Sequence, residues 1–382
     1  IVDRHDILRT CFVGLESEQI HQLVRSRAVL PVVEEDWQAL EEPEQKQRLE
    51  KFLLADKERG FNFSEAPLMR ISVIRLSPLK YHFIWTHHHA LLDGWCTPVI
   101  FGELLACYRA LAAGETPNLS EVIPYEHYIG WLYKKDQERG RSFWRNQLAG
   151  FSIPTPLVID KLPVDEGEAG NHLAQIDLGM EVSGKLSGLV KSSKSTMNVV
   201  VQAAWSYLLH CYGGESDVVF GATISGRPAD LPGVERMLGL FINTIPVRVR
   251  FEPGLKVGEL LRQLHEGNVA RDEYGYLSLA EIQRLSDVPK GMALFDSLLV
   301  FQNYPIGDSV WNRHGDQFHI ASVRTDEWSN YRLDLSVFLK ETLTLTMRFQ
   351  AERFSHETIR RLLSHLEKIL TGMAQAGTDG LV

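Results

Sequence analysis

Apolar and polar residues recur along the chain with two periods, which divide it into helices and strands. Apolar positions three and four residues apart predict helices at residues 44–59, 98–113, 198–211, 257–272 and 355–375. Short alternating or continuous apolar runs predict strands at residues 68–76, 81–86, 218–224, 241–250, 294–301, 333–340 and 343–350. Because helices and strands interleave in both halves, the pattern predicts an α/β protein with two lobes, each with a mixed sheet.

Residues 151–170 interrupt this periodicity with prolines, glycines and acidic residues, a composition typical of a linker. We therefore predict a linker at residues 156–170, between an N-terminal lobe (residues 1–155) and a C-terminal lobe (residues 171–382). The chain opens at Ile1 without an initiator methionine, in what resembles the middle of an element. This start predicts a piece of a longer protein.

The composition narrows the functional classes. With 382 residues, 44% of them hydrophobic and 23% charged, the chain is long enough for two packed lobes and ordinary for a globular protein. A formal net charge of −9 without a basic stripe argues against a nucleic-acid partner. No apolar run approaches the roughly 20 residues of a membrane helix. Four widely separated cysteines fit the reducing cytoplasm and lack metal-binding spacing.

Chemistry concentrates in residues 87–95, which read His-His-His-Ala-Leu-Leu-Asp-Gly-Trp and follow the predicted strand at 81–86. If the strand alternation continues, His87 and His89 share one face and His88 lies on the other. His89 is the strongest candidate, because an imidazole accepts a proton near neutral pH. A histidine in a strand is nevertheless more often a packing residue.

Asp93-Gly94 predicts a turn after the histidines, and Thr97-Pro98 predicts the start of the next helix. A junction of strand, loop and helix with imidazole and carboxylate groups is suited to present a reactive side chain. Asp93 could pair with an arginine that fixes the loop, or it could merely cap the helix.

Other chemistries find little support in the sequence. Three adjacent histidines raise the question of a metal, but strand geometry splits them over two faces and no other cluster has ligand spacing, so we expect none. No phosphate-binding loop and no Gly-x-Ser-x-Gly elbow occurs. Nucleotide hydrolysis and serine hydrolysis therefore have no candidate residues.

Residues 88–94 resemble the His-His-x-x-x-Asp-Gly signature of nonribosomal peptide synthetase condensation domains, within the chloramphenicol-acetyltransferase-like superfamily. Residues 4–10 resemble the family's Arg-His-x-x-Leu-Arg-Thr motif, and residues 125–131 its Tyr-x-x-aromatic-x-x-Trp motif. Residues 239–248 resemble Gly-x-Phe-x-Asn-Thr-x-Pro-x-Arg, and residues 294–305 resemble the family's late motif. These motifs follow the family order over nearly the whole chain.

Some positions depart from the family pattern. The opening motif that precedes the Arg-His segment is absent, which predicts a missing front segment. The usual Gln-Asp-x-Pro-Phe-Glu is not evident at residues 273–283, and residues 125–132 lack the Asp-Phe-Ala common in domains that join two L-residues. Both departures favour a subtype whose donor ends in a D-residue, or one with mixed stereochemistry. Cys96 stands where many members carry serine.

The resemblance implies two lobes that form a V-shaped pseudo-dimer, with the motif at the floor of a tunnel between them. An upstream donor carrier and a downstream acceptor carrier would deliver phosphopantetheine thioesters, and the acceptor amine would attack the donor thioester. The domain itself would bind no cofactor. Its further partner would be the adenylation domain of the same cytoplasmic synthetase, of which this chain would be a monomeric piece.

The same resemblance assigns roles to residues. His89 would be central, either accepting the proton of the amine or positioning it, and His88 would assist catalysis or simply pack. Asp93 would pair with Arg227 from the second lobe, and Gly94 would leave room for the pantetheine arm. The tunnel-lining candidates are Trp95, Ser225 and Asn243, whose amide could equally satisfy backbone groups.

Other functions stay open. Epimerisation domains share the heptapeptide, although the Asp93-Gly94-Trp95 context suits condensation better. A non-catalytic docking module would have the same fold, but such relatives have usually lost residues of the motif, whereas His88 and His89 are both present. A metal-dependent hydrolase, which belongs to another class of enzyme, is the least favoured alternative.

Overall fold

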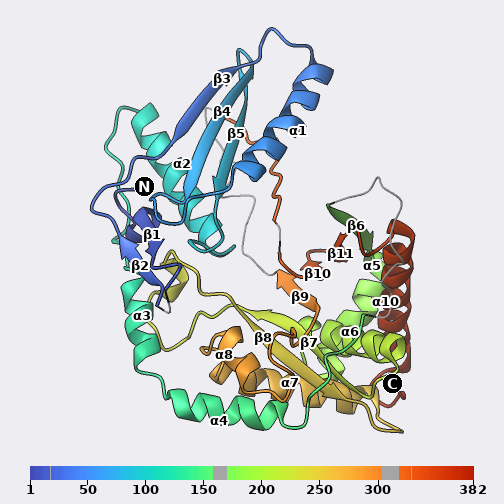
Figure 1. The fold of residues 1–382 in the computed structure, drawn as a ribbon. Coiled ribbons are helices and arrows are strands. Elements are labelled where there is room, and N and C mark those ends of the chain that lie inside the picture. Colours follow the sequence, from blue (N-terminus) through green and yellow to red (C-terminus); the bar gives the residue numbers. More distant parts are fainter. Residues whose placement is uncertain (18, 158–169, 303–317, 328) are drawn as a thin grey trace. The chain divides into compact units, whose positions relative to one another are not determined.

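The structure, a computed structural model, describes residues 1–17, 19–157, 170–302, 318–327 and 329–382 (Figure 1). These residues form two compact units. As far as they are described, the first unit contains residues 1–134, 227–241 and 304–322, and the second contains 135–226, 242–303 and 323–382. Residues 227–241 thus leave the second half of the sequence to join the first unit; we call them the crossing segment.

The first unit combines a small mixed sheet with helices. Its elements are η1 (Asp6–Arg9), β1 (Thr10–Val13), β2 (His21–Val24), β3 (Val32–Asp36), α1 (Glu42–Arg59), β4 (Met69–Ser77), β5 (Lys80–His87), α2 (Cys96–Ala112), α3 (Glu126–Tyr133) and η2 (Val234–Arg236). The sheet has the order β3-β4-β5, with β3 parallel to β4 and β4 antiparallel to β5. β1 and β2 form a separate antiparallel pair.

The described residues of the first unit form three apolar clusters, one of which surrounds Phe241 of the crossing segment. Trp37, Ile74 and Leu76 are buried together, and Phe52 of α1 lies edge-on to Trp37 at 6.3 Å between ring centroids. The second cluster surrounds Leu91 and Leu92, which directly follow the histidines. Leu238 of the crossing segment is buried in this second cluster. Burial of its apolar residues therefore holds the crossing segment in the first unit.

The second unit is larger and contains a six-stranded sheet. Its elements are α4 (Gln137–Leu148), β6 (Asn171–Asp177), α5 (Gly179–Ser193), α6 (Met197–Gly213), β7 (Asp217–Ile224), β8 (Asn243–Arg250), α7 (Val257–Glu273), α8 (Leu279–Arg284), β9 (Ser297–Gln302), β10 (Leu333–Leu339), β11 (Leu343–Gln350) and α10 (His356–Ala376). The strand order is β6-β11-β10-β9-β7-β8. β9 runs parallel to both of its neighbours, and the other pairs are antiparallel.

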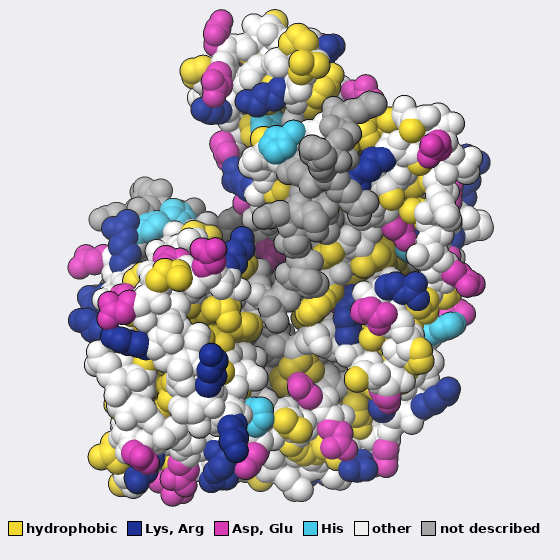
Figure 2. All heavy atoms as spheres, turned by 180° about the vertical axis from the view of Figure 1, so that it is seen from behind, with side chains coloured by type: hydrophobic (Ala, Val, Ile, Leu, Met, Phe, Trp, Pro, Cys, Tyr) yellow, Lys and Arg dark blue, Asp and Glu magenta, His cyan; other side chains and the backbone are white. Residues whose placement is uncertain are grey.

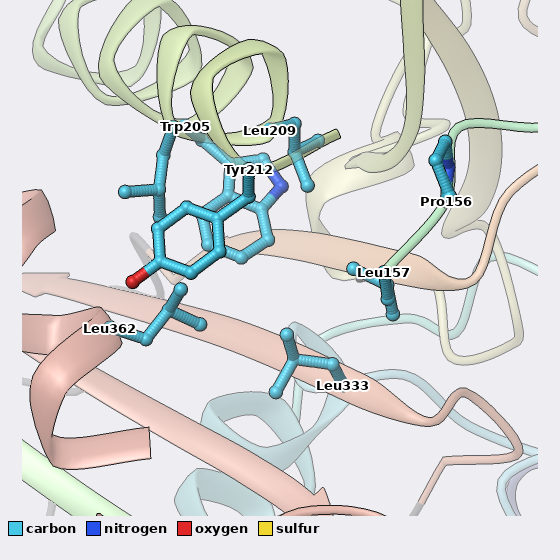
Figure 3. A pocket seen from close by; sticks show the side chains of 8 residues that line it. Pro156, Leu157, Trp205, Leu209, Tyr212, Leu333 and Leu362 are labelled. Carbon is cyan, nitrogen blue, oxygen red and sulfur yellow. The ribbon is translucent and has the colours of Figure 1, made fainter. Parts of the chain in front are cut away.

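One apolar core fills the space between this sheet and α5, α6, α7 and α10. Trp205 of α6, Phe220 of β7 and Leu366 of α10 are completely buried in it. A cavity of about 10 Å³ lies between α6, β10, α10 and residues 156–157, lined mostly by aliphatic and aromatic side chains (Figure 3). Because this volume holds about one water molecule and offers few polar partners, the cavity is a packing defect and no substrate site.

Every helix and strand predicted from the sequence is present. All five predicted helices are confirmed, with ends displaced by at most two residues, and the seven predicted strands occur with ends displaced by at most three. The predicted α/β class with mixed sheets is confirmed. The pattern missed α3, α4, α5 and α8 and the strands β1, β2, β3 and β6. α5 is rich in glycine and serine, which are poor helix formers, so its periodicity is weak.

The compact units do not follow the predicted lobe boundaries. Residues 135–155 belong to the second unit, because Trp144 and Leu148 of α4 are buried against Val219 and Ile245 of its sheet. The predicted strand at 241–250 begins at Asn243 as β8, since the preceding residues belong to the crossing segment. Residues 158–169 of the predicted linker lie outside the described residues.

Two surface observations bear on partners. None of the described helices combines the length and the apolar character that a bilayer crossing requires. On the face shown in Figure 2, Lys and Arg side chains intermingle with Asp and Glu side chains. The net negative charge is therefore not gathered into a single patch on this face.

Asp334 in β10 makes the stability of the second unit depend on pH. Burial raises the pKa of its carboxyl to about 6, although a hydrogen bond from Ser329 and the charge of Arg348 act in the opposite direction. Because the pKa is raised in the folded state, the buried carboxylate charge lowers the free energy of unfolding by its full amount above about pH 6. Below about pH 4 the carboxyl is protonated in both the folded and the unfolded state, and this loss of stability is absent.

Asp334→Asn is therefore expected to increase the free energy of unfolding by about 3 kcal/mol at pH 7.5, and by less at pH 5. Urea denaturation at the two pH values measures the difference, with the exposed Asp379→Asn as control. An equal effect of Asp334→Asn at both pH values would show that the buried charge is not the cause.

Candidate functional site

The candidate site is a turn between β5 and α2, residues 88–95, which we call the histidine turn. β5 ends at His87, although His88 N still donates to Leu68 O at 2.9 Å, and a hydrogen bond from Leu91 N to His88 O, 3.1 Å long, then closes a turn. Leu91 and Leu92 are then buried in the apolar cluster of the first unit. The strand ends at His87, and the predicted placement of His87 and His89 on one face with His88 on the other stays a prediction.

The next helix begins earlier than predicted. α2 starts at Cys96, with Trp95 as the preceding N-cap residue. Thr97-Pro98, predicted as the helix start, therefore lies inside the first turn. A proline is accommodated there because the first N–H groups of a helix have no partner within the helix.

His87 and His88 both make packing contacts, and the predicted catalytic assistance by His88 stays a prediction. The ring of His87 stacks on Trp85 at 4.3 Å between centroids, and burial lowers its pKa to about 4, helped by the charges of His89 and His88. His88 lies edge-on to Phe63, with ring centroids 4.5 Å apart. Its Nδ1 accepts a hydrogen bond from Ala90 N at 3.0 Å, which leaves Nε2 to carry the proton of the neutral ring.

His89 differs from its neighbours because it is exposed on the histidine turn. Among the described residues it has no hydrogen-bond partner, so its imidazole is available to a substrate. Exposure and the absence of a described partner are compatible with the predicted reactive role of His89. Its catalytic role stays a prediction.

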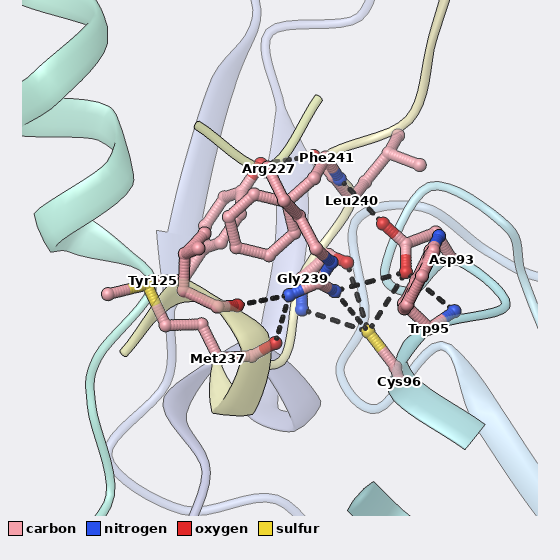
Figure 4. Close-up of polar contacts among 10 residues, drawn as sticks. Asp93, Trp95, Cys96, Tyr125, Arg227, Met237, Gly239, Leu240 and Phe241 are labelled. Carbon is pink, nitrogen blue, oxygen red and sulfur yellow. Dashed lines mark hydrogen bonds and ion pairs between the residues drawn. The ribbon is translucent and has the colours of Figure 1, made fainter. Parts of the chain in front are cut away.

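Asp93 holds the histidine turn in place through hydrogen bonds of its buried carboxylate. Its carboxylate is fully buried, and Oδ1 accepts hydrogen bonds from Trp95 N at 3.0 Å and from Arg227 Nη2 at 3.1 Å (Figure 4). The other oxygen, Oδ2, accepts one from Phe241 N at 3.0 Å. Asp93 thus joins the histidine turn to both ends of the crossing segment, which is more than capping α2.

Arg227 provides the positive charge for Asp93. It belongs to the first unit, so the expectation that it comes from the second lobe is wrong, although the expected ion pair is present. The guanidinium also donates to Val234 O and Met237 O, and it lies over the Phe241 ring at 4.0 Å from the centroid. These contacts give both terminal nitrogens of the buried guanidinium hydrogen-bond partners.

The sequence alone gave no sign of the contacts that Cys96 makes. Its thiol is completely buried and lies 3.1 Å from Gly239 O and 3.3 Å from Gly239 N. Burial raises the pKa of the thiol to about 12, and the charge of Asp93 acts in the same direction. Cys96 therefore stays protonated and hydrogen-bonded.

The aromatic motif at residues 125–131 packs against the crossing segment and donates hydrogen bonds to it. Tyr125 donates to Leu240 O at 2.5 Å and meets Phe241 edge-on at 5.2 Å between ring centroids. Trp131 donates from its indole nitrogen to Asp230 Oδ1 at 3.0 Å. The spacing of the motif was the available sequence signal, because these residues lie on one side of α3 or directly before it.

The remaining candidate site residues lie in different elements and make different contacts. Asn243 donates to Gly275 O at 2.8 Å and to Leu277 O at 2.6 Å within the second unit, which supports the reading that it satisfies backbone groups. Gly94 is half-buried, and its carbonyl accepts from Thr97 N at 3.3 Å. Trp95 is half-buried before α2, and Ser225 is exposed after β7. The tunnel-lining roles and the pantetheine role of Gly94 stay predictions.

Two further expectations concern metals and the late motif. Within the part of the chain that is described, no group of three or more His, Cys, Asp or Glu residues is placed to hold a metal ion. In the late motif, Leu294 and Phe295 are buried in the second unit. Residues 303–305 of this motif lie outside the described residues.

Gly239 is required where the crossing segment meets Tyr125. A Cβ atom at residue 239 would lie 2.1 Å from Cδ2 and 2.3 Å from Cε2 of the Tyr125 ring, which Phe241 and Leu240 hold in place. Gly239→Ala is therefore expected to lower the free energy of unfolding by at least about 1–3 kcal/mol.

Gly130→Ala is the matched control for this change. Gly130 lies in α3, and a Cβ atom there would have no described atom within 4 Å, so this variant should be stabilised by up to about 1 kcal/mol. Thermal denaturation compares both variants with the unchanged protein. An unaltered melting temperature for Gly239→Ala would show that Tyr125 does not pack tightly against residue 239.

Comparison with known proteins identifies the family. The family model described as the condensation domain matches residues 1–381. A linear gramicidin synthase of Brevibacillus parabrevis is 40% identical over 98% of this chain, and bacitracin synthase 3 of Bacillus licheniformis is 32% identical over 100% of it. The chain spans only 5% and 6% of the lengths of these two relatives. The chain belongs to the condensation-domain family of nonribosomal peptide synthetases.

Solved structures share the fold at lower sequence identity. A four-domain nonribosomal peptide synthetase bound to AMP and glycine superposes with a TM-score of 0.80 at 18% identity, covering 99% of this chain and 30% of that one. The X-domain from teicoplanin biosynthesis gives a TM-score of 0.79 at 22% identity, covering 100% of this chain and 87% of that one. The predicted fold class is confirmed by these likenesses.

Proposed function

We propose that this domain forms a peptide bond between two carrier-bound substrates. The amine of the downstream aminoacyl thioester attacks the thioester carbonyl of the upstream acyl or peptidyl group. A C–N bond forms, the C–S bond breaks, and the pantetheine sulfur leaves and takes up a proton. The observation that carries this proposal is the exposed His89 on a turn that the buried Asp93–Arg227 pair fixes.

His89 acts on the attacking amine. An α-amino group titrates near pH 8, so an appreciable fraction is neutral at pH 7 and a strong base is not needed. His89 either accepts the proton that the nitrogen loses or hydrogen-bonds the amine and holds it near the carbonyl. Both roles need an imidazole nitrogen without a protein partner.

The partners of the reaction follow from the family. They are the upstream and downstream peptidyl carriers with their phosphopantetheine arms, and the adenylation domain of the same cytoplasmic synthetase. The domain acts as a monomeric piece of a multidomain chain and binds no cofactor of its own. A donor ending in a D-residue is preferred, because residues 125–132 lack Asp-Phe-Ala and residues 273–283 lack the usual motif.

Transfer between loaded carriers tests the proposal directly. Each carrier is charged with a defined aminoacyl or peptidyl thioester, the donor in L and in D form, and intact-protein mass spectrometry follows transfer to the acceptor. A product-bearing acceptor carrier supports condensation, and faster transfer of the D donor supports the subtype. Exchange of the donor α-proton without transfer would support epimerisation, and neither reaction would support a docking module.

A further inference from the structure

We propose that Cys96 is a positioning residue for this reaction, because its thiol fastens the crossing segment to the histidine turn. This inference rests on the proposed function for its effect on rate. The effect of Cys96 on the structure is inferred from its hydrogen-bond geometry and burial alone.

The thiol lies at the centre of the contacts around Asp93 (Figure 4). The sulfur accepts the N–H of Gly239 at 3.3 Å, and Nη2 of Arg227 lies 3.6 Å away. Its single hydrogen can point to Gly239 O at 3.1 Å or to Asp93 Oδ1 at 3.5 Å. One side chain at the start of α2 therefore contacts three groups that define the site.

The contacts of Gly239 make this position effective. Its carbonyl also accepts a hydrogen bond from Asp93 N at 3.4 Å, and two residues later Phe241 N donates to Asp93 Oδ2. The thiol thus accepts the N–H of Gly239 and can donate its hydrogen to the C=O of the same glycine. Removal of the thiol leaves the buried N–H of Gly239 without this partner and loosens the backbone beside Asp93.

The thiol form suits this role. Because burial raises the pKa of Cys96 to about 12, the sulfur keeps its hydrogen at neutral pH and remains a donor. A thiolate here would place a second negative charge beside the Asp93 carboxylate and compete for Arg227. A neutral side chain that donates and accepts is therefore what the site requires, and serine meets this requirement too.

Three variants of the domain test the inference. Cys96→Ala removes the hydrogen bonds, Cys96→Ser restores a donor and acceptor, and Cys107→Ala removes a half-buried thiol from the same helix as a control. Hydrogen exchange followed by mass spectrometry reports on the amides of residues 239–241. Single-turnover transfer between loaded carriers reports kcat separately from the KM for the acceptor carrier.

Cys96→Ala is expected to exchange these amides about tenfold faster and to lower kcat about five- to twentyfold with unchanged KM. Cys96→Ser should stay within about twofold of the unchanged domain, and Cys107→Ala should match it. Unaltered exchange and rate in Cys96→Ala, a change in KM alone, or equal damage in the alanine and serine variants would overturn the inference. If the unchanged domain transfers nothing, the proposed function fails, while the exchange rates still decide whether Cys96 holds the crossing segment.

Discussion

Replacing His89 with alanine is expected to lower kcat for transfer between carriers by about 10²- to 10⁴-fold, the usual contribution of a side chain that moves a proton. The KM values for both carriers should change little, because the proposed role of His89 concerns the attacking amine and not the carrier domains. The melting temperature should not change, since the His89 side chain is exposed and has no hydrogen-bond partner among the described residues.

Two further histidines serve as controls for this variant. His21→Ala removes an exposed histidine of β2 and should leave both rate and stability unchanged. His88→Ala should lower stability together with activity, because its ring packs on Phe63 and accepts the hydrogen bond of Ala90. A rate for His89→Ala that equals that of the unchanged domain would place the chemistry elsewhere.

The pH profile separates the two roles proposed for His89. If the imidazole accepts the proton of the amine, kcat of the unchanged domain should fall at acid pH with an ionisation that His89→Gln lacks. If His89 only positions the amine, the two profiles should have the same shape, and glutamine should retain part of the rate through its amide group.

Removal of the Arg227 charge should have the largest effect on stability. Arg227→Met keeps an apolar stem but leaves the buried carboxylate of Asp93 without its cation, which is expected to cost about 3–5 kcal/mol. The carbonyls of Val234 and Met237 lose their donor as well. Urea denaturation measures the loss, and carrier transfer should fall with it because the histidine turn is no longer fixed.

Arg236→Met is the matched control, because Arg236 lies on the same crossing segment with more than half of its side chain exposed. Exposed ion pairs contribute little, so this variant should stay within about 0.5 kcal/mol of the unchanged domain. The double variant Asp93→Asn with Arg227→Met completes a cycle and should lose less than the sum of the single changes. Strict additivity would contradict a direct interaction between the two charges.

Predictions from the sequence succeeded where burial follows a local period. The helices at α6 and α10 and the hairpin of β10 and β11 bury one side or nearly all of their surface, so their apolar spacing marks them clearly. α5 has an ordinary helical geometry but carries glycine and serine at many positions, and its pattern is correspondingly weak. The sequence predicted the end of the strand at residue 86, one residue before the observed end at His87, but it gave no sign that Leu91 and Leu92 are buried directly after the histidines.

The α/β class, most elements, the family and the pairing of Asp93 with Arg227 could all be predicted from the amino-acid sequence. Three features emerged only from the folded chain: the crossing segment joins the first unit, His88 packs while His89 is exposed, and Cys96 bonds to Gly239. The difference lies in separation along the chain. Periodicity records burial within one element, whereas the bonds from Asp93 to Arg227 and Phe241 join residues 134 and 148 positions apart. Such contacts form only when packing brings their elements together.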